Sequence, residues 1–176
     1  MQRIMILGQP GAGKSTFARQ LGTVTGLPVV HIDTIHWKSG WVARSAAEKT
    51  QLCNEVHAQP RWIFEGGHSV TWPERLARAD ALIWLDLPLV VRSWRVFKRT
   101  MRHHGQDRPD LPAGCPERFD WEFTKWIWQT RRSARAKIIK LFENAPEQTR
   151  KWRLCSGPAC DQFIARLPFD GSGSPI

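Results

Sequence analysis

The sequence predicts an α/β fold in which a parallel sheet is covered by helices on both faces. Three observations support this prediction. Short apolar runs alternate with helix-compatible segments, a glycine-rich loop joins the first run to the first helical segment, and acidic residues follow several runs. The 176 residues are 41% hydrophobic, which is enough for one domain with a real core. We expect this domain at residues 1–170, followed by a flexible tail at 171–176.

The expected strands are short apolar runs separated by helical segments. Gly26 and Pro28 end the first helical segment, and Pro88 follows the fourth strand. The expected strands lie at 3–8, 29–32, 62–64, 81–85 and 152–155. The expected helices lie at 14–24, 46–57, 73–79, 89–104, 120–143 and 159–167.

The loop after the first strand reads GQPGAGKST, which fits the pattern G-x-x-x-x-G-K-[ST] of a phosphate-binding loop (P-loop). Its glycines let several backbone N–H groups point at one anion, and the following helix adds its positive end. Lys14 would contact the β- and γ-phosphates, and the Ser15 hydroxyl would bind Mg²⁺. The sequence therefore predicts a nucleoside triphosphate, expected to be ATP, with Mg²⁺. The expected ligands are Gly8, Gly11, Ala12, Gly13, Lys14, Ser15 and Thr16.

Acidic residues follow the second, third and fourth strands, at the sheet edge where such folds bind ligands. Glu65 is the candidate to hold Mg²⁺ through a water molecule, and the alternative is a plain strand-end carboxylate. Asp33 would position the phosphoryl acceptor, or take the proton of a hydroxyl acceptor. Asp86 is a weaker metal candidate. We favour a helix cap for it, because Asp is common before a helix start.

The segment at about 34–60 is expected to contact the acceptor. Trp37 and Trp41 would form an apolar wall there, although large aromatic residues are as often part of the core. Arg44 and Arg75 are candidates to bind an anionic group of the acceptor. The alternative for both is a solvated surface side chain.

Two stripes recur at helical spacing in the segment 89–104. The apolar stripe is predicted to be buried. The arginine stripe has no acidic partner on this helix, which indicates a surface for binding anions. The apolar residues are Val90, Trp94, Phe97 and Met101, and the arginines are Arg92, Arg95, Arg99 and Arg102.

A segment rich in Gly, Pro and Asp, at about 103–120, is expected to form a lid over the triphosphate. Arg108 and Arg118 would close onto the phosphates, and Cys115 would pack within the lid. The helix after the lid supplies further candidates to stabilise the transferring group, with a solvated helix face as the alternative. These candidates are Arg131, Arg132 and Arg135.

The charge is strongly positive and unevenly distributed. Residues 90–153 hold 16 Lys and Arg against 7 Asp and Glu, which accounts for most of the formal net charge of +10. Such a field attracts nucleotides or nucleic acid. We expect no membrane partner, because no apolar run reaches the length of about 20 residues that a span needs. The four cysteines show no CxxC spacing, which fits a reducing, cytoplasmic location.

These features resemble the adenylate-kinase-like nucleoside and nucleotide kinases. Longer segments are similar to the bacterial DNA topology modulation proteins, over nearly the whole chain up to Leu167. The strand-three motif differs, because that family usually has Asp-Gly-Asn-Tyr where this chain has Glu65, Gly66, Gly67 and His68. The similar segments are HIDTIHWKSGW, RWIFEGGHS, RADALIWLDLP, RVFKRTMRHHG and RPDLPAGCPERFDWEF.

The resemblance implies a five-stranded parallel sheet in the order 2-3-1-4-5 with a lid. In adenylate kinases an arginine eleven residues after the strand-four proline lies on the adenine, and the corresponding residue here is Arg99. Arg95 also falls on an arginine of that pattern. The implied activity is ATP- and Mg²⁺-dependent phosphoryl transfer to a nucleoside or nucleotide. The alternatives are a hydroxyl metabolite such as a sugar acid, and a nucleic-acid-associated ATP-binding protein that affects DNA topology. The oligomeric state stays open between monomer and dimer.

Overall fold

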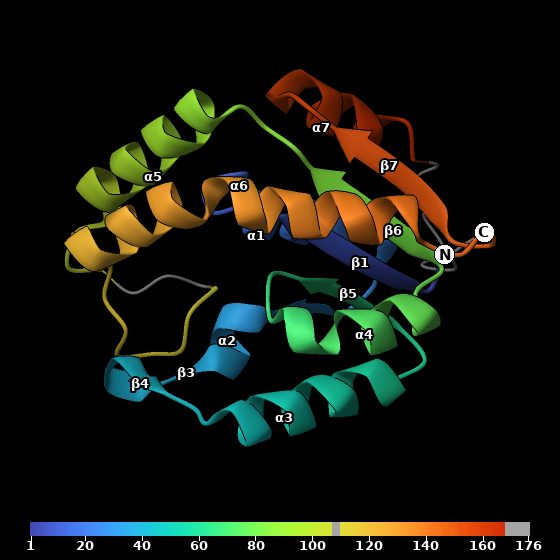
Figure 1. Ribbon diagram of the computed structural model, residues 1–176, viewed down its shortest axis with the longest axis horizontal. Coiled ribbons are helices and arrows are strands. Elements are labelled where there is room, and N and C mark those ends of the chain that lie inside the picture. Colours follow the sequence, from blue (N-terminus) through green and yellow to red (C-terminus); the bar gives the residue numbers. More distant parts are fainter. Residues whose placement is uncertain (107–109, 168–176) are drawn as a thin grey trace.

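The computed structural model describes residues 1–106 and 110–167 of the chain. Its centre is a five-stranded sheet in the order β2-β5-β1-β6-β7, in which every neighbouring pair is parallel (Figure 1). Counted along the chain, these strands have the predicted order 2-3-1-4-5, so the expected fold is confirmed. The tail expected at 171–176 lies outside the described residues. The strands are β1 (Arg3–Gly8), β2 (Val29–His31), β5 (Trp62–Glu65), β6 (Ala81–Leu85) and β7 (Arg150–Leu154).

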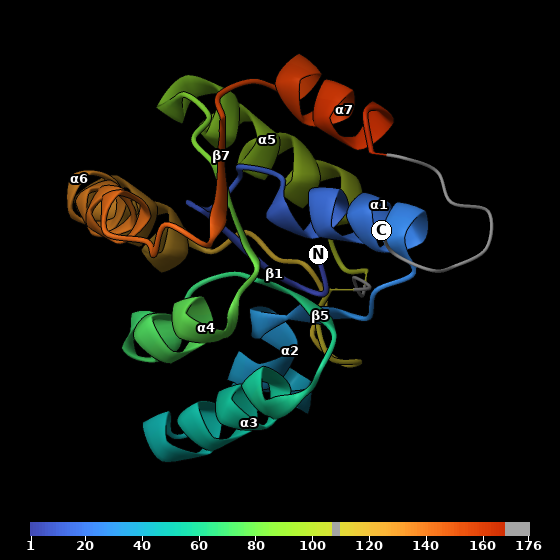
Figure 2. The ribbon, with the colours of Figure 1, turned by 90° about the vertical axis from the view of Figure 1, so that its right-hand side faces the viewer.

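Helices cover both faces of the sheet (Figures 1 and 2). Ile4 and Ile6 of β1 pack toward α1 (Lys14–Thr25) and α7 (Gly157–Ala165). Met5 and Leu7 alternate to the other face, toward α3 (Ala46–Ala58), α4 (Trp72–Arg78) and α6 (Trp121–Glu143). Because both faces are buried, the central strands are apolar at nearly every position.

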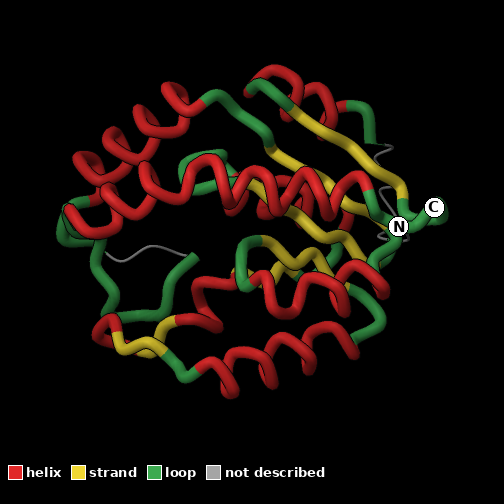
Figure 3. The backbone as a smooth tube through the Cα atoms, in the orientation of Figure 1, coloured by secondary structure: helices red, strands yellow, loops and turns green. Residues whose placement is uncertain are grey.

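A small antiparallel pair lies apart from the central sheet, on the predicted acceptor side (Figure 3). The second strand is one residue shorter than expected, because the chain turns into a short helix at Ile32. Gly40 takes a positive φ of 75° at the turn of the pair, which glycine adopts without steric cost. The elements of this region are α2 (Ile32–His36), β3 (Trp37–Lys38), the 3₁₀ turn η1 (Ser39–Trp41) and β4 (Val42–Ala43), and a second 3₁₀ turn, η2 (Ser69–Thr71), precedes α4.

The helix α5 (Leu89–His103) lies at the edge of the molecule beyond the carboxyl ends of the strands (Figure 1). The prediction that its apolar stripe is buried is wrong. The exposed fractions are 79% for Val90, 61% for Trp94, 51% for Phe97 and 68% for Met101. The physical reason is that the opposite, polar face of α5 lies against the P-loop.

None of the helices in the described part of the chain has the length and apolarity that crossing a membrane requires.

Candidate active site

The P-loop joins β1 to α1 at the carboxyl edge of the sheet. Gly11 and Gly13 have positive φ angles of 77° and 90°, and Gly13 is the N-cap residue of α1. A Cβ atom at Gly11 would lie 2.3 Å from the backbone oxygen of Arg92, so only glycine lets the loop approach α5 this closely. Lys14 Nζ donates to the backbone oxygen of Gln9 at 3.5 Å, which keeps the ammonium over the loop.

Glu65 lies at the end of β5, where its carboxylate faces the P-loop. Its Oε1 atom accepts a hydrogen bond from Ser15 Oγ at 3.0 Å and lies 2.9 Å from His31 Nδ1. Burial by itself would raise the pKa of the Glu65 carboxyl. The hydrogen bond from His31 and the positive charge of Lys14 outweigh it, so that the pKa lies below its ordinary value. An ionised carboxylate can only accept, so His31 Nδ1 carries the proton.

His31 was not among the residues predicted for the site. It is the last residue of β2, which pairs with β5 in register, so His31 lies opposite Glu65. Part of the signal was present in the sequence, because His31 lies within one predicted strand and Glu65 directly follows the neighbouring strand in the predicted sheet order. That His31 would be the partner of the buried Glu65 carboxylate could be predicted only once the register of the two strands was known.

The Ser15 hydroxyl and the Glu65 carboxylate fit the oxygen ligands that Mg²⁺ prefers. Mg²⁺ keeps several water molecules and is usually held by one or two protein oxygens together with substrate phosphates. Ser15 would bind it directly, and Glu65 would hold a coordinated water.

The N-terminal half of α5 contributes arginines to the edge of the P-loop. Arg92 is buried, and its Nε and Nη1 atoms donate to the backbone oxygens of Leu87 and Pro10 at 3.0 and 3.2 Å. Arg95 Nη1 donates to the Ala12 oxygen at 3.2 Å. The inner face of α5 is therefore polar because it contacts the carbonyl groups of the loop.

The C-terminal half of α5 is joined to the predicted lid. Arg99 Nη2 forms an ion pair with Glu117 Oε1 at 3.3 Å, and Thr100 Oγ1 donates to the same oxygen at 3.0 Å. Arg118 lies 5.4 Å over the ring of Trp41, whereas it was expected near the phosphates. Arg108 lies outside the described residues. The contact expected between Arg99 and adenine stays a prediction.

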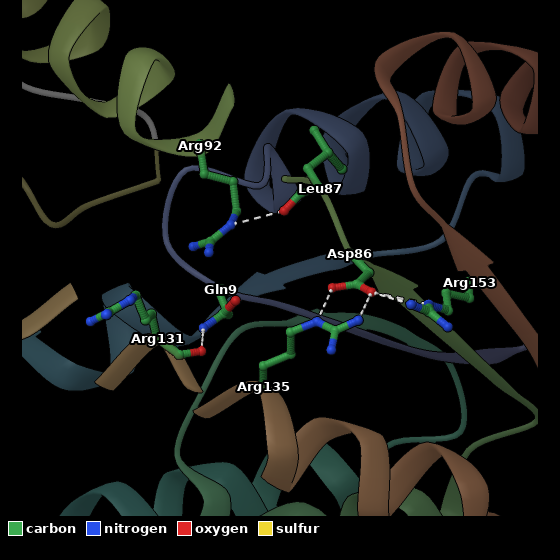
Figure 4. Close-up of polar contacts among 7 residues, drawn as sticks. All are labelled: Gln9, Asp86, Leu87, Arg92, Arg131, Arg135 and Arg153. Atoms are coloured by element: carbon green, nitrogen blue, oxygen red, sulfur yellow. Dashed lines mark hydrogen bonds and ion pairs between the residues drawn. The ribbon is translucent and has the colours of Figure 1, made fainter. Parts of the chain in front are cut away.

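The Asp86 carboxylate binds two arginines from different elements (Figure 4). Arg135 of α6 donates to both of its oxygens at 3.0 and 2.7 Å, and Arg153 of β7 donates twice to Oδ2 at 3.0 and 2.6 Å. Burial raises the pKa of Asp86, but these hydrogen bonds outweigh it and lower the pKa overall. The expected helix cap is wrong, because Pro88 occupies the N-cap position of α5 without a side-chain cap.

The α6 helix is also attached to the P-loop. Gln9 is buried, and its Nε2 atom donates to the backbone oxygen of Arg131 at 2.6 Å (Figure 4). The Arg131 guanidinium donates to the Trp128 oxygen and lies 3.9 Å over the Trp128 ring. The structure therefore brings the backbone of Arg131 beside the P-loop. The guanidinium groups of Arg131 and Arg135, in contrast, bind Trp128 and Asp86 within the protein.

A cavity of about 590 Å³ lies between the P-loop, α5, α6 and β7. Its wall is rich in arginine, with one acidic residue. The polar residues that line it are Gln9, Asp86, Arg92, Arg131, Arg132, Arg135 and Arg153.

On the acceptor side, the predicted lid packs onto the β3–β4 pair. Trp37 and Trp41 are half-buried and meet edge to face at 5.3 Å. Trp41 Nε1 donates to the Pro116 oxygen at 3.2 Å, and Trp41 N donates to Cys115 Sγ at 3.4 Å. Cys115 is fully buried, as expected for a packing residue. The two tryptophans thus join the lid segment to the acceptor-side segment.

Asp33 lies half-buried in the first turn of α2, two residues after the end of β2. Arg44 holds the end of this helix, because its Nη1 atom donates to the oxygens of Thr34, Ile35 and Trp37 at 2.9, 3.0 and 2.7 Å. The Nη1 group of Arg44 therefore stabilises the carboxyl end of α2. The acceptor contacts of Asp33 and Arg44 stay predictions.

Arg75 does not lie on a surface open to an acceptor. It is 0% exposed, and its guanidinium lies 3.6 Å over the ring of Phe64. Its Nη1 atom donates to the Gly66 oxygen at 3.1 Å, and its Nε atom donates to His57 Nε2 at 3.2 Å. Neither the expected acceptor contact nor the solvated alternative fits this placement. Arg75 supports the backbone after β5, just behind Glu65.

No family model matches the chain. The chain is 29% identical to a shikimate kinase of Halorhodospira halophila over 133 residues. This alignment covers 65% of this chain and 70% of that protein.

Two solved structures share the fold. A shikimate kinase from Acinetobacter baumannii in complex with shikimate aligns with a TM-score of 0.58 at 20% identity, covering 95% of this chain and 92% of that one. An unliganded sugar kinase from Janibacter sp. aligns with a TM-score of 0.56 at 14% identity, covering 100% and 99%. These comparisons place the fold among the P-loop kinases.

Proposed function

We propose that the protein is an ATP- and Mg²⁺-dependent kinase that transfers a phosphoryl group to a small acceptor. The observation that supports this best is the cluster of Lys14, Ser15 and Glu65 on a P-loop at the carboxyl edge of the sheet. The pKa of the Glu65 carboxyl is lowered and His31 orients this side chain, so little reorganisation would be needed for the reaction. The similarity to a shikimate kinase supports the same reaction class.

In this proposal the acceptor oxygen attacks the γ-phosphorus of ATP, the bond to the β,γ-bridging oxygen breaks, and ADP leaves. Lys14 and the loop amides hold the phosphates, and Arg95 neutralises charge at the rim. Ser15, together with Glu65 through a water molecule, would hold Mg²⁺, which would supply positive charge to offset that of the phosphates. If the acceptor is a hydroxyl, Asp33 would take its proton.

For the acceptor we keep two classes. The sequence resemblance favours a nucleoside or nucleotide, held between Trp37 and Trp41 and the sheet edge. The second class is a hydroxyl metabolite, the kind of acceptor that the name of the similar shikimate kinase implies for that protein. We further propose that Arg99 contacts the adenine, that Arg131 and Arg135 approach the transferring group when ligands bind, and that Arg44 contacts the acceptor.

The decisive experiment is an acceptor screen with ATP labelled at the γ-phosphate, covering nucleosides, nucleotides, sugars and hydroxy acids. We expect transfer of the label to one class, and a loss of at least about a hundredfold in Lys14→Ala, since the phosphate charge is then unbalanced. Lys137→Ala, an exposed lysine on α6, is the matched control and should keep its activity. Full activity of Lys14→Ala, or no transfer to any acceptor, would reject the proposal.

The nucleic-acid alternative makes a different prediction. Binding through phosphate contacts weakens steeply as the salt concentration rises. Tight duplex binding that persists at physiological salt, without label transfer, would favour that alternative.

A further inference from the structure

The α5 helix carries an apolar face that the described part of the protein does not cover. Its four apolar residues Val90, Trp94, Phe97 and Met101, here called the outer stripe, are each more than half exposed. Helices of folded domains usually turn such a stripe toward the core. At about 1.5 Å per residue, the outer stripe is about 16 Å long.

This orientation is fixed by the opposite face of the helix. Arg92 and Arg95 donate to carbonyl groups of the P-loop, and Thr100 donates to Glu117. Gly11 packs directly on the backbone of Arg92. Rotating α5 to bury the outer stripe would break all of these contacts, so the stripe faces outward as long as the P-loop is intact.

The exposed apolar area is large for a single protein. An aromatic side chain offers roughly 150–250 Å², so the outer stripe exposes on the order of 500 Å², near the largest patch on a typical monomer, about 300–600 Å². The first turns of α6 add more exposed rings. These belong to Trp121, Trp126 and Trp128, with 66%, 48% and 58% of each residue exposed.

The charged residues of α5 itself are all positive. Arg95, Lys98 and Arg102 are exposed, and the segment from Leu89 to His103 contains no acidic residue. The chain as a whole carries a formal charge of +10. A second copy packed on this helix would bring like charges together, so an anionic partner is favoured.

We propose that α5 binds an anionic lipid membrane surface. The outer stripe would enter the boundary between headgroups and acyl chains, and Lys98 and Arg102 would meet the anionic headgroups. A helix with aromatic and aliphatic residues on one face and Lys and Arg on the rest is the sequence type that lies in this interface, where tryptophan is also enriched. Such attachment needs no spanning segment, so it differs from the membrane partner that the sequence argued against.

Two observations favour lipid over a macromolecule with a fixed shape. The exposed rings lie on two helices, and a fluid surface accepts both without complementary pockets. For single-stranded nucleic acid, ring faces must be free to stack on bases. Trp94 and Phe97 instead stack on each other, at 5.7 Å and 29°.

The experiment is co-sedimentation of the full chain with vesicles of phosphatidylcholine alone and with an equimolar mixture of phosphatidylcholine and phosphatidylglycerol. We expect binding to the mixed vesicles only. Trp94→Ser with Phe97→Ser should weaken it at least about tenfold, while Val42→Ser with Val70→Ser, which removes equally exposed apolar residues elsewhere, should not.

The charge is tested separately, because any basic protein is attracted to anionic vesicles. Lys98→Gln with Arg102→Gln should weaken binding by roughly fivefold per residue, and clearly more than the matched pair Lys137→Gln with Lys140→Gln. Circular dichroism confirms that each variant is folded.

Three outcomes would overturn the proposal. The first is the absence of binding to the mixed vesicles. The second is binding that the Trp94 and Phe97 substitutions leave unchanged. The third is a dimer in solution, or capture of single-stranded DNA, that these substitutions abolish while vesicle binding is absent.

Discussion

The Glu65 side chain is buried at the candidate site and contacts both Ser15 and His31. It is 2% exposed, yet its pKa is lowered, because His31, Lys14 and Ser15 together outweigh the cost of burial. A buried carboxylate that is ionised and held in place is a suitable acceptor for the hydrogen atoms of a magnesium-bound water. The residue type was predictable from the strand-end position, whereas its ionised state follows from the partners that the fold supplies.

Asp86 offers a test at the same scale. Asp86→Asn should lower the free energy of unfolding by about 1–2 kcal/mol at neutral pH, because Arg135 and Arg153 lose charged hydrogen bonds and are themselves partly exposed. Urea unfolding of the two proteins measures the difference. Asp161→Asn, which changes an exposed aspartate on α7, is the control.

The stability difference between wild type and Asp86→Asn should also depend on pH. Because the folded-state pKa of Asp86 is lowered, its stabilisation is present above the ordinary pKa of an aspartate, about 4, and is lost as the pH falls through the folded value. The difference in stability between wild type and Asp86→Asn should therefore shrink below about pH 4. A difference that grows with acidification would contradict the assignment.

At the scale of elements, the contact between the P-loop and α5 decides how that helix is oriented. The sequence pattern of α5 shows an apolar and a basic stripe, and general experience assigns the apolar stripe to the core. The structure reverses this assignment, since the carbonyl groups of the loop need donors and the arginines supply them. No periodicity within α5 carries that information, because it depends on which element lies opposite.

Gly11→Ala should disrupt this contact. Its φ is 77°, and the new Cβ would lie 2.3 Å from the Arg92 oxygen, a backbone atom that cannot move alone. We expect a loss of about 2–4 kcal/mol in the free energy of unfolding. Gly26→Ala, with a φ of 65° and open space around the new methyl group, should cost only about 1 kcal/mol. Equal losses in the two variants would show that the close approach of α5 contributes nothing.

At the scale of the whole molecule, segments more than 70 residues apart meet on the predicted acceptor side. The lid segment meets the β3–β4 pair through Cys115, whose Sγ atom donates to the Lys38 oxygen and accepts from Trp41 N, both at 3.4 Å. This contact links the position of the predicted lid to the shape of the predicted acceptor region.

Cys115→Ala tests that dependence. Removing the buried sulfur should destabilise the protein by about 1–2 kcal/mol and speed hydrogen exchange at the Trp41 amide. Under the proposed function, KM for the acceptor should rise more than kcat falls. Cys155→Ala, at an exposed position, should leave the stability, the exchange rate at Trp41, KM and kcat unchanged. Slow exchange at Trp41 in Cys115→Ala would mean that other contacts hold the two segments together.

The sequence by itself determined the parallel sheet and the phosphate loop, because apolar periodicity and glycine spacing are local properties, while the order of the strands followed from the resemblance to a known family. It also determined which strand ends carry acids. Only the tertiary structure decided what those side chains do. His31 serves Glu65 through strand register, Arg75 is buried behind the site, Asp86 holds two arginines, and α5 faces outward. Each of these roles depends on a partner distant in sequence, and such a partner leaves no mark on the local pattern.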